Sequence, residues 1–289
     1  MSVQAALEAL PGAQAPDVPV TVIQPTNGWI RLHLRELWSF RELCYFFAWR
    51  DVKVRYKQTL LGAAWAVIPP LLMMVVFTLV LKQVAHLSSY GKPYALFSYA
   101  ALVPWTLFTS ALAGVSNSMV ANAQLVAKIY FPRLLLPLAA ALTPLVDFVI
   151  ALALLAALML AYSTAPSAAV LLLPLLVVLT VLAALALGLW FAALNVRYRD
   201  FQYTVPFMIQ LGLFVTPVAY TTSSLPRAAQ AILALNPMTG VIEGFRWALL
   251  GTPAPSGATL VISCAATILL LGSGLAYFRR AERTFADII

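Results

Sequence analysis

Residues 50–70 read RDVKVRYKQTLLGAAWAVIPP and join a dense basic cluster to the start of an apolar segment. The basic cluster consists of Arg50, Lys53, Arg55 and Lys57. The apolar part contains two consecutive prolines, Pro69 and Pro70, neither of which has the backbone N–H that a regular helix turn needs. The stretch therefore predicts a helix that begins beside a basic collar and bends at the two prolines.

The composition places this helix in a membrane. Hydrophobic residues make up 62% of the 289 residues and charged residues only 10%, whereas a soluble domain has about 25% charged residues. The formal net charge is +8, which could suggest nucleic-acid binding if the cations were gathered on a soluble face. They stand instead at the ends of apolar runs, so we expect a membrane protein that does not bind nucleic acid.

Six apolar segments are long enough to cross a bilayer, which requires about 20 residues. The segment at 222–252 differs, because prolines and glycines interrupt it, and we expect two short re-entrant helices there. The sequence thus predicts an all-α integral membrane protein with six transmembrane helices. The predicted spans are 61–81, 95–119, 134–162, 168–194, 201–221 and 258–278.

The distribution of Lys and Arg predicts the orientation. Fourteen cations lie before the first span, between spans two and three, between spans four and five, or after span six. The other four are Lys82, Lys92, Arg227 and Arg246. Because positive loops stay in the cytoplasm, both termini are predicted to be cytoplasmic.

The N-terminal region divides into two parts. Residues 1–30 have no helical period and none of the features of a signal peptide, and are predicted to form a disordered tail. Residues 31–49 repeat apolar residues at helical spacing with charges between them, which predicts a helix lying in the cytoplasmic membrane interface. Residues 31–289 are expected to form one transmembrane domain.

A stripe of three aromatic residues and one amide lies in the predicted fifth span. Tyr203, Phe207, Gln210 and Phe214 recur at spacings of four, three and four, which places them on one helix face. Aromatic faces and an amide suit sugar rings, which can stack on the former and hydrogen-bond to the latter. The alternative interpretation is packing against a neighbouring helix.

The segment 121–137 between spans two and three contains a short amphipathic pattern. A short helix of this kind can dock in a groove on a cytoplasmic partner, and the alternative is an ordinary interhelical loop. The residues that would contact the partner are Asn122, Gln124, Leu125 and Lys128.

Three charged residues lie within apolar surroundings. Glu243 and Arg246 are spaced i and i+3 and can pair on one helix face, as part of an outer gate or as a structural ion pair. Asp147 is the carboxylate well inside a span. It is a candidate for proton relay by its position, but its lone carboxylate beside Thr143 and Pro144 favours an interhelical contact.

The residues of common catalytic and cofactor sites do not form recognisable sets. The sequence has two isolated histidines, no phosphate-binding GxxxxGK[ST] loop and no evident Ser/His/Asp arrangement. We therefore favour a transport subunit over a membrane enzyme or a passive scaffold, and expect no metal or cofactor in this chain.

Four blocks occur in a fixed order along the chain: RDVKVRYKQTLLGAAWAVIPPLL, KIYFPRLLLPLA, NVRYRDFQYTVPFMIQLGLFVTPVAY and NPMTGVIEGFRWALLG. With them, the chain from about residue 36 to its end resembles the permease subunit of type-2 ATP-binding cassette exporters. The resemblance is to the bacterial polysaccharide branch, which exports O-antigen, teichoic acid and related polymers.

The resemblance implies a homodimer in the bacterial inner membrane that recruits two separate ATP-binding cassette subunits. ATP and Mg would be bound by those subunits, and residues 31–49 and 121–131 would contact them. The substrate would be a lipid-linked polysaccharide that follows the dimer interface, lined by spans one and five. This adds Trp65 and Phe77 to the Tyr203–Phe214 stripe as residues of the substrate path.

The basic cluster then acquires a second role beside orientation. We interpret Arg50, Lys53, Arg55 and Lys57 as an entrance for the anionic head group of the lipid-linked polymer. A type-2 exporter of small hydrophobic drugs or lipids is the alternative function. The sequence leaves open which polysaccharide is moved and whether its lipid anchor travels with it.

Overall fold

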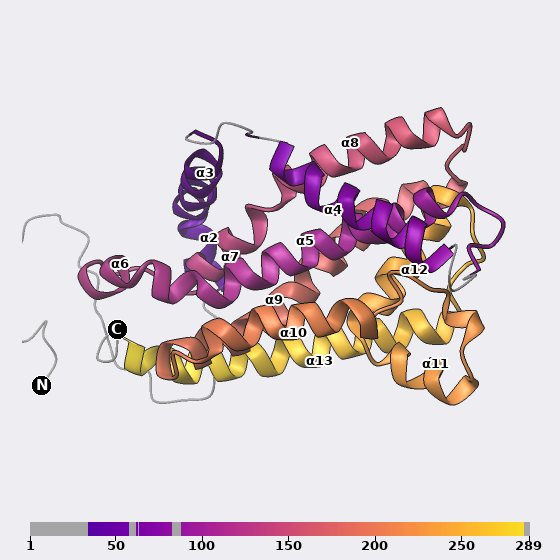
Figure 1. Ribbon diagram of the computed structural model, residues 1–289. Coiled ribbons are helices and arrows are strands. Elements are labelled where there is room, and N and C mark those ends of the chain that lie inside the picture. The colour runs from indigo at the N-terminus through magenta and orange to yellow at the C-terminus, as the bar shows by residue number, and fades with distance from the viewer. Residues whose placement is uncertain (1–33, 58–61, 63, 83–87, 286–289) are drawn as a thin grey trace, which may run out of the picture. The chain divides into compact units, whose positions relative to one another are not determined.

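The computed structural model describes residues 34–57, 62, 64–82 and 88–285, and within these ranges the chain is helical, with no β-strand (Figure 1). The prediction of an all-helical chain is therefore confirmed for the described residues. The predicted tail at 1–30 and the start of the predicted interface helix lie outside them.

The N-terminal helices extend further than the sequence predicts. Helix α2 (Leu34–Ser39) and helix α3 (Arg41–Lys57) are separated by a turn at Phe40, so the basic cluster lies on α3 itself. Helix α4 (Ala64–Val76) runs through both prolines, and the backbone then changes to a π-helix, η1 (Phe77–Lys82).

The remaining helices follow the predicted order. After η1 come α5 (Tyr94–Ala121), α6 (Ala123–Lys128), α7 (Leu135–Leu142), α8 (Leu145–Ala161), η2 (Ala168–Leu172) and α9 (Leu173–Arg197). The C-terminal part contains α10 (Phe201–Val215), η3 (Thr222–Ser224), α11 (Arg227–Ala234), α12 (Pro237–Leu250), α13 (Gly257–Ala281) and η4 (Glu282–Thr284).

Four helical stretches are long and apolar enough to cross a membrane: Tyr94–Ala121, Leu135–Ala161, Ala168–Arg197 and Gly257–Thr284. They correspond to the second, third, fourth and sixth predicted spans. The stretches for the first and fifth spans, Ala64–Val80 and Phe201–Val215, are apolar but shorter.

Helix α5 lies at the centre of the helix packing and is buried along most of its length. Its closest neighbour is α9, where small residues allow the two backbones to approach, as is common between membrane helices. At Gly188, a Cβ atom would lie 2.5 Å from Val115 Cγ1 of α5. The α5–α9 contact therefore depends on the absence of a side chain at this position.

A break between α7 and α8 places Asp147 in the first turn of α8. The Thr143 hydroxyl donates a hydrogen bond of 3.0 Å to the Ala139 carbonyl, and Pro144 cannot donate a backbone hydrogen bond. The third predicted span is interrupted here, and its second part, α8, packs against α4.

Aromatic contacts fix α3 and the C-terminal end to the rest of the chain. Phe47 of α3 packs against Phe131, with 5.7 Å between ring centroids, and Phe278 meets Phe285 edge to face at 5.5 Å. All four side chains belong to one buried cluster with residues of α7 and α9. In Figure 1, α3 lies across the direction of the long helices, above α7.

Candidate functional site

Two of the four cations of the basic cluster line a cavity. Arg50 and Arg55 contribute to a cavity of about 550 Å³, together with Asn117 of α5 and Asn122, which directly follows α5. Lys53 and Lys57 are exposed, and the Lys53 ammonium lies 5.5 Å from the centre of the Trp49 ring. Arg50 is thus partly buried, Arg55 lines the cavity but stays exposed, and the two lysines lie outside the cavity lining.

Each cavity arginine is paired with a carboxylate. Arg50 Nη2 lies 2.8 Å from Asp51 Oδ1, and the same nitrogen donates a 2.8 Å hydrogen bond to Asn122 Oδ1. Arg55 Nη1 lies 2.6 Å from Asp147 Oδ2. The Arg50 guanidinium is therefore held by charge-assisted hydrogen bonds, which are stronger than neutral ones, and the Arg55 guanidinium by an ion pair.

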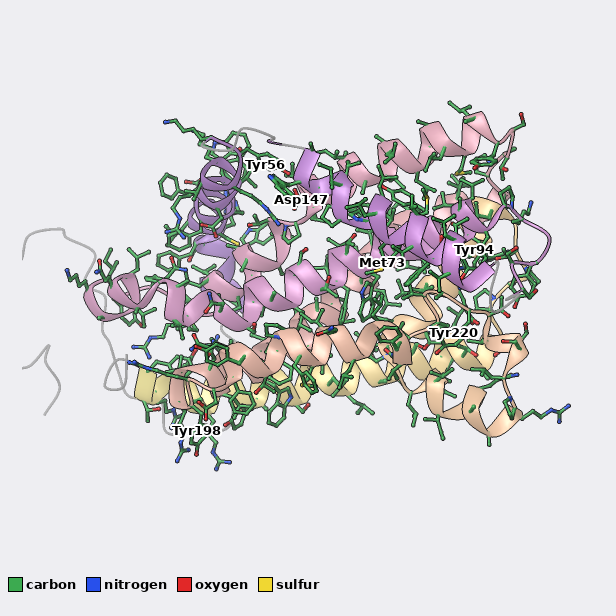
Figure 2. All side chains as sticks on the ribbon, in the orientation of Figure 1. Tyr56, Met73, Tyr94, Asp147, Tyr198 and Tyr220 are labelled. Carbon is green, nitrogen blue, oxygen red and sulfur yellow. The ribbon has the colours of Figure 1, made fainter. Side chains whose placement is uncertain are left out.

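Asp147 makes the interhelical contact that the sequence favours for it. Its second oxygen, Oδ1, accepts a hydrogen bond from the Tyr56 hydroxyl, and Figure 2 shows the two side chains together between α3 and α8. Burial, followed by the hydrogen bond to Asp147, raises the pKa of Tyr56 to about 12. Because Tyr56 stays protonated at neutral pH, it is a constant donor to the carboxylate.

The aromatic stripe of α10 is on the surface of the chain. Tyr203 is 74% exposed, Phe207 61% and Phe214 69%, and Gln210 is exposed between them. Trp65 of α4 is also exposed, at 58%. Among the residues that the structure describes, the stripe is therefore not packed against another helix of the same chain.

Phe77 does not belong with these exposed residues. Its side chain is 6% exposed and packs in the main buried cluster with α5. The prediction that Phe77 lines a path is therefore wrong for this structure. The physical reason is helical periodicity, because Phe77 stands twelve residues from Trp65 and therefore about 120° around a regular helix from it, on a face that packs against α5.

The predicted docking segment contains a short helix, α6, with exposed and buried sides. Gln124 and Lys128 are exposed, Leu125 is half-buried and packs against the buried aromatic cluster, and Asn122 precedes the helix. The Asn122 amide donates to the Ser118 carbonyl at 2.9 Å and accepts from Arg50. Asn122 is thus engaged inside the chain, and Gln124 and Lys128 remain available to a partner.

Arg246 does not pair directly with Glu243. Its guanidinium is buried and donates to four backbone carbonyl oxygens, those of Phe97, Pro217, Val218 and Tyr220, at 2.5–3.2 Å. It also lies 3.5 Å from the centre of the Phe97 ring. Arg246 therefore ties the chain after α10 to the start of α5. These four carbonyls, the carbonyl clamp, take the place of the ion pair that the i and i+3 spacing predicts.

Glu243 faces a small polar pocket, and Arg246 lines the same pocket. The pocket measures about 210 Å³ and is lined mainly by hydroxyl-bearing residues from η3, α12 and the loop before α13. The Thr222 hydroxyl donates to Glu243 Oε1. Glu243 forms no ion pair with any residue that the structure describes.

Several of the groups that hydrogen-bond to the site residues cannot be predicted from the sequence. Tyr56 gives no signal of its own, since it reads as one more residue of the basic segment. Three of the four carbonyls that bind Arg246 belong to the irregular segment 216–221, and no side-chain pattern identifies them. Thr143–Pro144 is the usable signal, because it predicts the break that brings Asp147 towards α3.

Four long apolar helical stretches and two shorter ones are typical of a multi-pass helical membrane protein. The family model described as "ABC-2 type transporter" matches residues 42–250. The chain belongs to this family, which confirms the resemblance, and its role is transport rather than catalysis.

Curated proteins with similar sequences support this assignment. The O-antigen export system permease protein RfbA of Myxococcus xanthus is 31% identical over 262 residues, covering 90% of this chain and 100% of that protein. RfbA of Klebsiella pneumoniae is 27% identical over 241 residues, covering 83% and 92%. The polysialic acid transport protein KpsM of Escherichia coli is 22% identical over 253 residues, covering 81% and 91%.

Proposed function

We propose that this chain is the transmembrane permease subunit of an ATP-driven exporter that moves a lipid-linked polysaccharide from the cytoplasm across the bacterial inner membrane. The main support is the similarity to RfbA of Myxococcus xanthus over that protein's full length. The exposed face of Tyr203, Phe207, Gln210 and Phe214 is consistent with a substrate rich in sugar rings.

The proposed topology has six spans with both termini in the cytoplasm. The two shorter helical stretches, Ala64–Val80 and Phe201–Val215, are counted as the first and fifth spans. Helices α11 and α12 are proposed to re-enter the membrane from the outer side. Their broken backbone would be covered by protein, which suits the almost complete burial of α12.

The proposed assembly is a homodimer with two ATP-binding cassette subunits, which bind ATP and Mg. Helix α3 and the exposed residues Gln124 and Lys128 of α6 are proposed to contact those subunits. The polymer path is proposed to run between the two copies of this chain, along Trp65 and the α10 stripe.

The basic cluster is proposed to receive the anionic head of the lipid-linked polymer. Arg50 and Arg55 line a cavity of about 550 Å³, and the exposed Lys53 and Lys57 add positive charge on the same helix. A phosphate group entering the cavity would compete with Asp51 and Asp147 for the guanidinium groups, which bind phosphate bidentately.

The test is the location of surface polymer in a strain that lacks this chain but keeps polysaccharide synthesis. Polymer is detected with antibody on whole cells and on lysed cells. Loss at the surface with accumulation inside supports the proposal. Unchanged surface polymer contradicts it and leaves an exporter of small hydrophobic drugs or lipids as the function to test.

A further inference from the structure

The polar pocket beside Glu243 is built from residues that can hydrogen-bond to a ligand. Its lining includes Tyr90, Thr222, Ser223, Gln230 and Glu243. The Tyr90 and Ser223 hydroxyls are 2.8 Å apart, and the partly exposed Tyr90 ring adds an aromatic surface. A carboxylate, several hydroxyls, an amide and an aromatic ring together match the donors, acceptors and C–H faces of a sugar ring.

The carboxylate has unused hydrogen-bonding capacity. An ionised carboxylate can accept about four hydrogen bonds, and among the described residues Glu243 accepts one, from Thr222. Arg246, the neighbouring cation, does not occupy the other acceptor positions of the carboxylate, because its hydrogen bonds go to backbone carbonyls. A partly buried carboxylate in this state favours a ligand that supplies hydroxyl donors.

The size of the pocket limits the ligand to one small unit. Its volume of about 210 Å³ lies below the roughly 300–1,000 Å³ of pockets that enclose a drug-sized molecule. A metal ion fits less well, since Ca²⁺ takes six to eight oxygen ligands, usually with several carboxylates, and the pocket supplies a single carboxylate.

The pocket is linked to the outer end of the aromatic stripe. Helix α10 ends at Val215, directly after Phe214. The Tyr220 hydroxyl donates to the carbonyls of Phe214 and Val215, at 3.3 and 3.1 Å. Tyr220 is followed by Thr221 and Thr222, which line the pocket. The segment 215–222 therefore connects the end of the stripe directly to the lining of the pocket.

We infer that this pocket is a sugar-binding subsite at the outer end of the polymer path, with Glu243 accepting hydrogen bonds from the hydroxyl groups of one sugar unit. The inference rests on the proposed function, which supplies a polysaccharide substrate and the orientation of the chain. The subsite would hold the emerging end of the polymer while the next length is moved.

The test is crosslinking from the pocket to the cell's own polymer. Ser223→Cys is labelled with a benzophenone maleimide in a background where the free cysteines Cys44 and Cys264 are replaced by Ser. After illumination, polymer on the protein band is detected by periodate oxidation of its diols and hydrazide labelling. Leu269→Cys, exposed on α13 away from the pocket, is the control position.

We expect polymer adducts from position 223 and not from position 269. Adding Glu243→Gln, which keeps the shape and the acceptor for Thr222, should lower the adduct yield about tenfold, because a hydrogen bond to a charged acceptor is lost. Asp200→Asn, exposed at the start of α10, removes the same charge elsewhere and should leave the yield unchanged.

Two results would overturn the inference while the proposed function stands. One is normal surface polymer without adducts from position 223 or from Ala254→Cys, a second position in the pocket lining. The other is an adduct yield that Glu243→Gln does not change. The proposed function itself is tested by a separate experiment, the deletion of the whole chain, and it fails if surface polymer persists in that strain.

Discussion

The Arg55 guanidinium lies 2.6 Å from the Asp147 carboxylate, and this ion pair joins helix α3 to the first turn of α8. Tyr56, the next residue on α3, donates to the other oxygen of the same carboxylate. Asp147 is largely buried, whereas Arg55 is about half exposed. One carboxylate thus fixes α3 beside the cavity that Arg50 and Arg55 line.

Replacing Asp147 should loosen this attachment. Asp147→Asn removes the charge and should lower the stability of the detergent-solubilised protein by about 1 kcal/mol, since half-exposed ion pairs contribute little and the hydrogen bond to Tyr56 can persist. Thermal unfolding measures the change. A double-mutant cycle with Arg55→Gln should show a coupling energy, and strictly additive losses would mean that the pair contributes nothing.

The raised pKa of Tyr56 predicts a dependence on alkaline pH. Tyr56 lies on α3, outside the apolar helices, and burial and the Asp147 hydrogen bond raise its pKa to about 12 from the ordinary value of 10. Between these values the unfolded chain releases a proton that the folded chain keeps. The stabilisation is therefore fully present below pH 10 and is lost as pH rises towards 12.

The measurement is the unfolding temperature of the wild type and of Tyr56→Phe across this pH range. Tyr56→Phe lacks the titrating group, so its unfolding temperature should fall less steeply than that of the wild type. Parallel curves for the two proteins would contradict the assignment of the raised pKa to Tyr56.

Arg246 should be essential for the folding of the protein rather than for the opening of an outer gate. Arg246→Gln leaves several buried carbonyls without donors, and losses of this kind cost about 1–3 kcal/mol per group. We expect loss of the monodisperse peak in size-exclusion chromatography. Arg246→Lys should rescue it only in part, because an ammonium lacks the planar fork of five donors. A well-folded Arg246→Met protein would refute the carbonyl clamp.

Two glycines of α13 provide a matched pair. At Gly274 a Cβ atom would lie 2.7 Å from the Ala186 carbonyl oxygen of α9, whereas at Gly272 it would meet nothing within 4 Å. Gly274→Ala should destabilise the protein by about 1–3 kcal/mol through overpacking. Gly272→Ala should stabilise it by up to about 1 kcal/mol, because alanine favours a helix. Equal unfolding temperatures of the two variants would contradict the close α9–α13 contact.

The sequence predicted the features that depend on composition and helical period. Apolar runs located the long helices, and the spacing of Tyr203, Phe207 and Phe214 placed them on one face, because these signals are local. The interhelical contact of Asp147 agrees with the prediction from its place beside Thr143 and Pro144, whereas the break between α7 and α8 lies inside the span 134–162 that the sequence predicts as continuous.

Features that depend on distant backbone were not predictable. The i and i+3 spacing of Glu243 and Arg246 suggested an ion pair, but the carbonyls of the segment 216–221 take the guanidinium instead. Phe77 was assigned to a path from its place on the first span. Which helix covers that face of the span depends on the packing of α5, and in the structure Phe77 belongs to the buried cluster with it.

The last prediction concerns the exposed stripe of α10. Replacing both Phe207 and Phe214 with Leu keeps apolar bulk but removes the aromatic faces. If sugar rings stack on these faces, surface polymer should decrease several-fold, since each aromatic contact is worth about 0.5–1.5 kcal/mol beyond its buried area. Surface antibody binding after induction of polymer synthesis gives the rate.

The control is the double variant Met208→Leu/Val215→Leu, which replaces two exposed residues of the same helix and leaves every aromatic residue in place. This variant should export at the wild-type rate. Because the stripe could also hold two copies of the chain together, the oligomeric state of both variants is measured in detergent. A slow Phe207→Leu/Phe214→Leu variant with unchanged assembly assigns the stripe to the substrate, and wild-type export by that variant would remove it from the path.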